Sequence, residues 1–93
     1  MVDQDTLSVH VGCTTCKLGP GKQFEVMNYL YERYGQEVPI KDLIDEIWED
    51  RETEMGTIYS TVSQLRNTLE NGGLSRVVIE GKRGYYRLHL SGE

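Results

Sequence analysis

The stretch TIYSTVSQLRNTLENGGLSRVVIEGKRGYYRL, residues 57–88, carries the strongest structural signal in the chain. Four apolar residues recur at helical spacing and share one narrow arc: Ile58, Val62, Leu65 and Leu69. A Gly72-Gly73 pair ends this pattern. The runs 77–79 and 85–88 are typical of β-strands, and the basic glycine loop 81–84 joins them. The stretch therefore predicts a helix over about 57–70, followed by a β-hairpin with a cationic tip.

The opposite side of this helix is small and polar. Exposed helix positions more often hold long Lys or Glu, and Ser, Thr and Asn are mediocre helix formers. Hydroxyl and amide groups can read base edges in the major groove of DNA. We therefore expect the following residues to contact DNA: Thr57, Tyr59, Ser60, Ser63, Gln64 and Asn67. The alternative is an ordinary solvated helix face.

Basic side chains accompany this helix and hairpin. Lys82 and Arg83 at the tip are expected to contact phosphates or the minor groove, and Arg66 and Arg87 to add phosphate contacts. The alternative is that Lys82 and Arg83 sit in a solvated turn and that Arg66 and Arg87 form local ion pairs.

The rest of the chain supplies the other elements of one small α+β domain. Residues 1–6 are expected to form a tail, and 7–93 a single domain. Strands are expected at 7–11 and 14–18. Helices are expected over 22–34, with Gly35 as C-cap, and from Val38-Pro39 to about Glu49. We further expect Leu88 and Leu90 to pair with the N-terminal strand.

The net charge of −5 is unusual for a nucleic-acid-binding domain, because such domains are commonly basic. The charge is unevenly distributed. Residues 1–55 carry 12 acidic and 5 basic side chains, whereas residues 56–93 carry 3 acidic and 5 basic ones. The expected DNA-contacting half is therefore the basic half. Its small excess of basic over acidic side chains predicts that the lone domain binds DNA weakly. The acidic second helix is expected to face away from DNA.

Cys13 and Cys16 have the spacing of half a zinc site or of a redox pair. A zinc site with four protein ligands would also need His10 and His89. This requires the strands at 7–11 and 86–90 to be adjacent. The redox interpretation lacks a helix that begins at the pair. We favour two reduced thiols without a metal.

No catalytic constellation or phosphate-binding loop occurs, so we expect no enzymatic activity and no cofactor. The first residues do not resemble a secretory signal peptide, and no apolar run reaches the roughly 20 residues of a membrane helix. We expect a cytoplasmic protein without membrane contact.

The order of these pieces from Leu18 to Leu88 resembles the OmpR/PhoB-type effector domain of bacterial response regulators, a winged helix-turn-helix. Four segments carry the resemblance: LGPGKQFEVM at 18–27, LIDEIW at 43–48, TIYSTVSQLRNTL at 57–69 and YYRL at 85–88. The match covers about three quarters of the chain. It departs from the family on the outer face of the third helix, where only Arg66 stands in place of several Arg or His residues.

The resemblance implies an N-terminal β-sheet, three helices and a C-terminal hairpin wing. It also implies transcriptional regulation through double-stranded DNA, with the third helix in the major groove. The family commonly binds as a tandem dimer on direct repeats and carries a receiver domain, which this sequence lacks. The alternative is a protein-interaction module on the same fold, which the acidic total and the missing arginines would favour.

Overall fold

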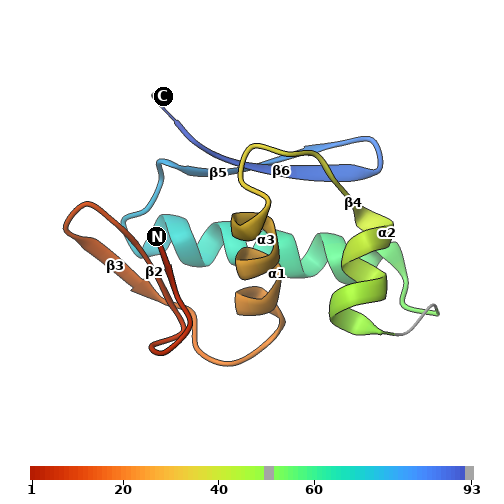
Figure 1. Ribbon diagram of the computed structural model, residues 1–93, viewed down its shortest axis with the longest axis horizontal. Helices are drawn as coiled ribbons and strands as arrows, with labels where there is room; N and C mark the ends of the chain where they lie inside the picture. Colours follow the sequence, from red (N-terminus) through yellow and green to blue (C-terminus); the bar gives the residue numbers. More distant parts are fainter. Residues whose placement is uncertain (50–51, 92–93) are drawn as a thin grey trace.

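The computed structural model describes residues 1–49 and 52–91. The helices pack with two antiparallel three-stranded sheets, whose strand orders are β1-β2-β3 and β4-β6-β5. The elements follow one another as β1 (Val2–Asp3), β2 (Ser8–Val11), β3 (Thr14–Lys17), α1 (Lys22–Glu32), β4 (Val38–Pro39), α2 (Ile40–Leu43), η1 (Ile44–Trp48), α3 (Met55–Asn71), β5 (Val77–Lys82) and β6 (Tyr85–Leu90). In Figure 1 strands β2 and β3 lie at the left end of the molecule, and strands β5 and β6 lie above the helices. The expected α+β winged-helix architecture is thus present.

The N-terminal sheet buries one face against the helices. Val9 and Cys16 are directly opposite each other on β2 and β3, and both are buried. The first six residues, expected to be a tail, include β1, in which Val2 pairs with Val9. This segment is therefore partly sheet, and a strand of two residues is too short to leave a periodic signal in the sequence.

The first two helices form most of the core opposite α3. In α1 the buried residues are Phe24, Val26, Met27 and Leu30. The helix ends at Glu32, two residues before the expected end at 34. Gly35 follows at φ 80° and donates its backbone N–H to the Leu88 carbonyl, which ties the end of α1 to β6.

The second helix differs from its expected form at both ends. Val38 and Pro39 form strand β4, and α2 begins at Ile40. The helix then widens into the π-helical segment η1, with a hydrogen bond from the Glu49 N–H to the Ile44 carbonyl. Its C-terminal end receives the Lys22 ammonium, which donates to the Ile47 carbonyl at 2.9 Å. Residues 50 and 51 of the acidic connector lie outside the described residues.

The long helix α3 confirms the predicted amphipathic pattern. Ile58, Val62, Leu65 and Leu69 are at most 1% exposed and face the core. The helix begins at Met55, a half-turn before the expected start, and ends at Asn71. Gly73 at φ 83° then turns the chain toward β5, with the Leu74 N–H bonded to the Leu69 carbonyl.

The C-terminal hairpin is longer than predicted, because both strands extend to the two-residue turn at Arg83-Gly84. Its strand β6 is central: it pairs with β5 on one side and with β4 on the other. The expectation that Leu88 and Leu90 pair with the N-terminal strand is therefore wrong. Leu88 is opposite Ile79 and Leu90 is opposite Val77, both on β5. The partner strand β4 was not predicted because two residues are too few to show an alternating pattern.

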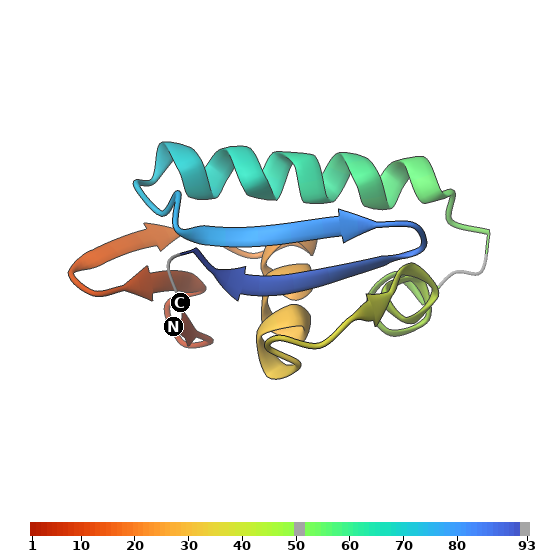
Figure 2. The ribbon, with the colours of Figure 1, turned by 90° about the horizontal axis from the view of Figure 1, so that it is seen from above.

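Figure 2 shows how these layers position the polar surface. Helix α3 lies along one side of the molecule, the β5–β6 hairpin lies beside it, and α1 and α2 pack directly against α3. The hairpin tip lies near the N-terminal end of α3 (Figure 2). Within the ranges 1–49 and 52–91, no helix combines the length and apolar character that crossing a membrane requires.

Candidate nucleic-acid interface

The outward face of α3 is open to solvent along its length. All six residues expected to read DNA bases are exposed: Thr57, Tyr59, Ser60, Ser63, Gln64 and Asn67. Tyr59 leaves 48% of its surface exposed, which is unusual for a large aromatic residue. Because the apolar arc of α3 is buried, these hydroxyl, amide and phenol groups form a continuous polar surface on the opposite side.

The hairpin places its tip beside the N-terminal half of this surface (Figure 2). Gly84 adopts φ 82°, which suits the tight turn, and its carbonyl accepts the Ile40 N–H at 2.8 Å. The tip is therefore attached to the start of α2. Arg83 is exposed at the turn, and within the described part of the chain it has no ion-pair or hydrogen-bond partner. The exposed hairpin tip thus carries a cation that has no partner among the described residues.

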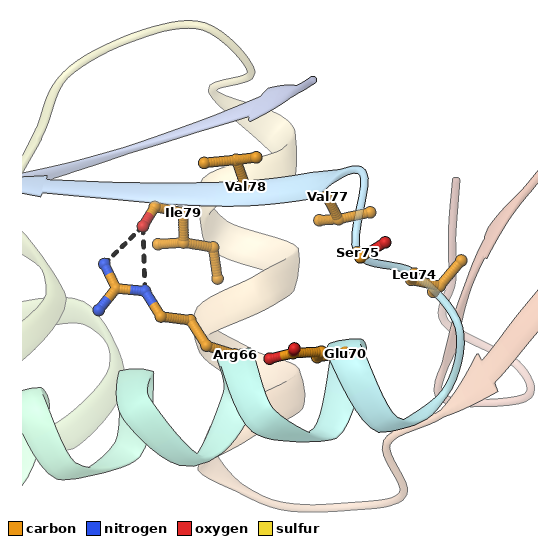
Figure 3. Close-up of a pocket in the computed structure, with 7 residues that line it drawn as sticks. All are labelled: Arg66, Glu70, Leu74, Ser75, Val77, Val78 and Ile79. Carbon is orange, nitrogen blue, oxygen red and sulfur yellow. Dashed lines mark hydrogen bonds between the residues drawn. The ribbon is translucent and has the colours of Figure 1, made fainter. Parts of the chain in front are cut away.

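Arg66 has a different environment from the one expected. Its guanidinium donates from Nε to the Ile79 carbonyl at 3.1 Å and donates a second hydrogen bond from Nη2 to the same oxygen (Figure 3). It also lies 5.7 Å from the centre of the Tyr86 ring. Arg66 therefore connects α3 to the outer strand of the hairpin, and only its remaining N–H groups are available to a phosphate.

A groove of about 310 Å³ lies between the C-terminal half of α3 and the edge strand β5. Figure 3 shows its lining: Arg66, Glu70, Leu74, Ser75, Val77, Val78 and Ile79. The Arg66–Ile79 hydrogen bonds cross one end of this groove, and Glu70 places a carboxylate on its α3 side (Figure 3). The groove separates the polar face of α3 from the hairpin strands.

Arg87 lies on the outer face of the hairpin. Alternate strand residues point to opposite faces, and its neighbours Tyr86 and Leu88 are buried. Its guanidinium donates to the Glu80 carboxylate at 2.6 Å, directly across the strand pair. The structure therefore does not bring Arg87 together with the polar face of α3.

Glu80, which the sequence did not single out, has several charged neighbours on the hairpin. Besides Arg87, the Lys82 ammonium lies 3.3 Å and His89 Nε2 lies 3.5 Å from its carboxylate. The hydrogen bonds from Arg87 and then Lys82 hold the pKa of Glu80 below its usual value. The signal was present in the hairpin register, since strands that pair around Arg83-Gly84 place Glu80 opposite Arg87.

The acidic second helix contacts α3 through α2 and contacts α1 through η1. Burial raises the pKa of Tyr29 on α1, Arg33 opposes this shift, and the charges of Asp42 and Glu46 add to it. Those two carboxylates are thus close enough to α1 to act on Tyr29. That the second helix faces away from DNA stays a prediction.

The cysteines do not form part of a metal cluster in the described ranges. Cys13 is exposed, whereas Cys16 is buried and its thiol donates to the Thr68 carbonyl at 3.4 Å. His10 is on β2 and His89 is on β6, and these strands belong to different sheets. The adjacency that a four-ligand zinc site requires is therefore missing, and residues 1–49 and 52–91 contain no group of three or more His, Cys, Asp or Glu suited to a metal.

Comparison with known proteins gives the chain a family. The family model described as "Transcriptional regulatory protein, C terminal" matches residues 14–88, which run from β3 to the end of the buried part of β6. Neither the search of curated proteins nor that of solved structures found a match. The matched segment covers most of the chain and includes α3 and the hairpin. The chain therefore belongs to the family of C-terminal domains of transcriptional regulatory proteins, which are DNA-binding winged helices rather than enzymes.

Proposed function

We propose that this domain binds double-stranded DNA with α3 in the major groove and the hairpin tip on a phosphate or in the minor groove. The observation that carries the proposal is the exposed polar face of α3 beside the cationic tip. The groups that would read base edges are the side chains of Ser60, Ser63, Gln64 and Asn67, with Thr57 and Tyr59 at the N-terminal end. Recognition helices contact bases mainly through their N-terminal residues, and the tip lies near that end (Figure 2).

The ion pairs refine the phosphate contacts expected from sequence. Of the four expected cations, Arg66 is held by the Ile79 carbonyl, and Lys82 and Arg87 share Glu80. Arg83 alone has no such partner in residues 1–49 and 52–91. Because the Lys82 pair is exposed and weak, Lys82 can exchange its carboxylate for a phosphate. One or two phosphate contacts predict a slope of log affinity against log salt of about −0.9 to −1.8, and four would give about −3.6.

A fluorescence anisotropy titration with a labelled random-sequence duplex tests this proposal. The Lys82→Ala/Arg83→Ala double variant is expected to bind more weakly, with a slope near zero. The matched control, Lys17→Ala/Arg76→Ala, removes two positive charges away from the hairpin tip, one at the end of β3 and one just before β5, and is expected to keep the wild-type slope. Failure of the wild type to bind any duplex at low salt would contradict the proposal.

The same titration decides the alternative function, a protein-interaction module. The alternative is supported by the acidic total charge and by the internal partners of three of the four candidate cations. It predicts no duplex binding at low salt by either wild type or control. A tandem homodimer on direct repeats and a receiver or other partner domain remain part of the proposal, and sedimentation of the domain with one-site and two-site duplexes tests the former.

A further inference from the structure

The outer face of the hairpin carries a charge arrangement of which the proposed binding mode uses only Lys82. Glu80 is near the middle of this face, within 3.5 Å of cationic or basic groups of Lys82, Arg87 and His89. Its carboxylate oxygens are divided between them: Oε2 contacts Arg87 and His89, and Oε1 contacts Lys82. One carboxylate thus holds two of the hairpin's three permanent cations.

We propose that Glu80 is a specificity-determining residue, which competes with phosphates for Lys82 and Arg87, weakens their contacts to DNA and so leaves the choice of DNA site to α3. This inference rests on the proposed DNA-binding function. Phosphate contacts add affinity for every sequence equally, whereas base contacts distinguish sequences. A wing with three available cations would raise the affinity for all DNA. A wing in which Glu80 occupies two of them binds non-specific DNA weakly.

The geometry makes this exchange a direct competition. The Arg87 guanidinium is 2.6 Å from Glu80, and both side chains are partly exposed, at 39% and 30%. Lys82 is next to the turn, and its side chain is 54% exposed. Neither cation is enclosed by the protein, so a side chain freed from Glu80 can reorient toward solvent. Glu80 itself also repels a phosphate that approaches the hairpin.

Replacing Glu80 with Gln tests the inference, because it keeps the shape and removes the charge. We expect tighter binding of a random-sequence duplex and a salt slope steeper by about 0.9 for each cation released. Between about 50 and about 200 mM salt, the variant should lose about 3.5-fold more affinity than wild type per released cation. Adding Lys82→Ala to this variant should remove part of the gain. In an otherwise wild-type chain, Lys82→Ala should change the slope less.

The matched control is Glu32→Gln. Glu32 also pairs with an arginine, Arg33, at 3.6 Å, but on α1. This variant has the same net charge as Glu80→Gln and should keep the wild-type slope. A second variant, Glu80→Thr, removes the charge with a residue that favours strands and should reproduce the steeper slope.

The outcomes separate the two proposals. If wild type binds DNA and both Glu80 variants keep its slope, or share any change with Glu32→Gln, the inference about Glu80 is overturned and the binding mode stands. If neither wild type nor the Glu80 variants bind any duplex at low salt, both proposals fail. Selection of a preferred sequence adds a further check: the ratio of specific to non-specific affinity should fall in Glu80→Gln.

Discussion

Replacement of Arg66 by Met measures how much this residue stabilises the fold by connecting α3 to β5. The change keeps much of the side-chain length and removes both hydrogen bonds to the Ile79 carbonyl. A hydrogen bond from a charged donor contributes about 1.5–3 kcal/mol. Because Arg66 is exposed and both hydrogen bonds share one acceptor, water can replace part of this stabilising free energy in the variant. We therefore expect the free energy of unfolding to fall by about 1–2 kcal/mol.

For a domain of this size, a loss of 1–2 kcal/mol lowers Tm by about 4–16 °C. Thermal unfolding followed by circular dichroism measures this shift. Arg66→Lys, which keeps the charge but not the two-donor geometry, should lie between wild type and Met. The control is Arg76→Met, since the Arg76 side chain donates one long bond of 3.3 Å, to the Ser91 carbonyl, within the described part of the chain. An unchanged Tm in Arg66→Met, together with a slope of log DNA affinity against log salt that is shallower by about 0.9, would show that Arg66 binds a phosphate. It would refute the stabilising role of Arg66.

Three further predictions concern packing, thiol reactivity and pH. Gly81→Ala should destabilise the domain by about 1–3 kcal/mol in urea unfolding, because its Cβ would lie 2.9 Å from the Tyr86 ring; wild-type stability would contradict the packing. With an aromatic disulfide reagent, Cys13 should react in the folded protein and Cys16 only on unfolding, because burial raises the pKa of Cys16; equal rates would contradict this. The lowered pKa of Glu80 means that its carboxylate stabilises the fold above the unfolded-state pKa of about 4.3. That contribution should be lost as pH falls below about 4, and Glu80→Gln should flatten this part of the stability profile.

The sequence predicted the elements that have a long periodic pattern. The apolar arc of α3 specified both the helix and its exposed face, since burial at one side of a helix determines what remains at the other. The strands of the hairpin were also recognised, although their turn was placed too broadly. Both depend on local spacing, which a single sequence contains.

Contacts between distant segments were not predicted, for physical reasons that differ between them. Strand β4 has two residues, so no alternation can reveal it. The partner of Arg66 is a backbone carbonyl, which every residue possesses, so side-chain types give no indication of it. The widening of the second helix at η1 has no sequence signal that we can identify. Glu80 could have been found only with the turn placed at Arg83-Gly84, because that register puts it opposite Arg87.

The position of β6 between β4 and β5 has a consequence for the thermodynamics of recognition. The wing is attached to the start of α2, to the end of α1 and to α3 before any ligand arrives. Association would therefore require little ordering of this segment, and its conformational entropy is already lost on folding. Amide hydrogens that join the central strand to both neighbours should exchange slowly even in the isolated domain, and duplex DNA should protect them little further.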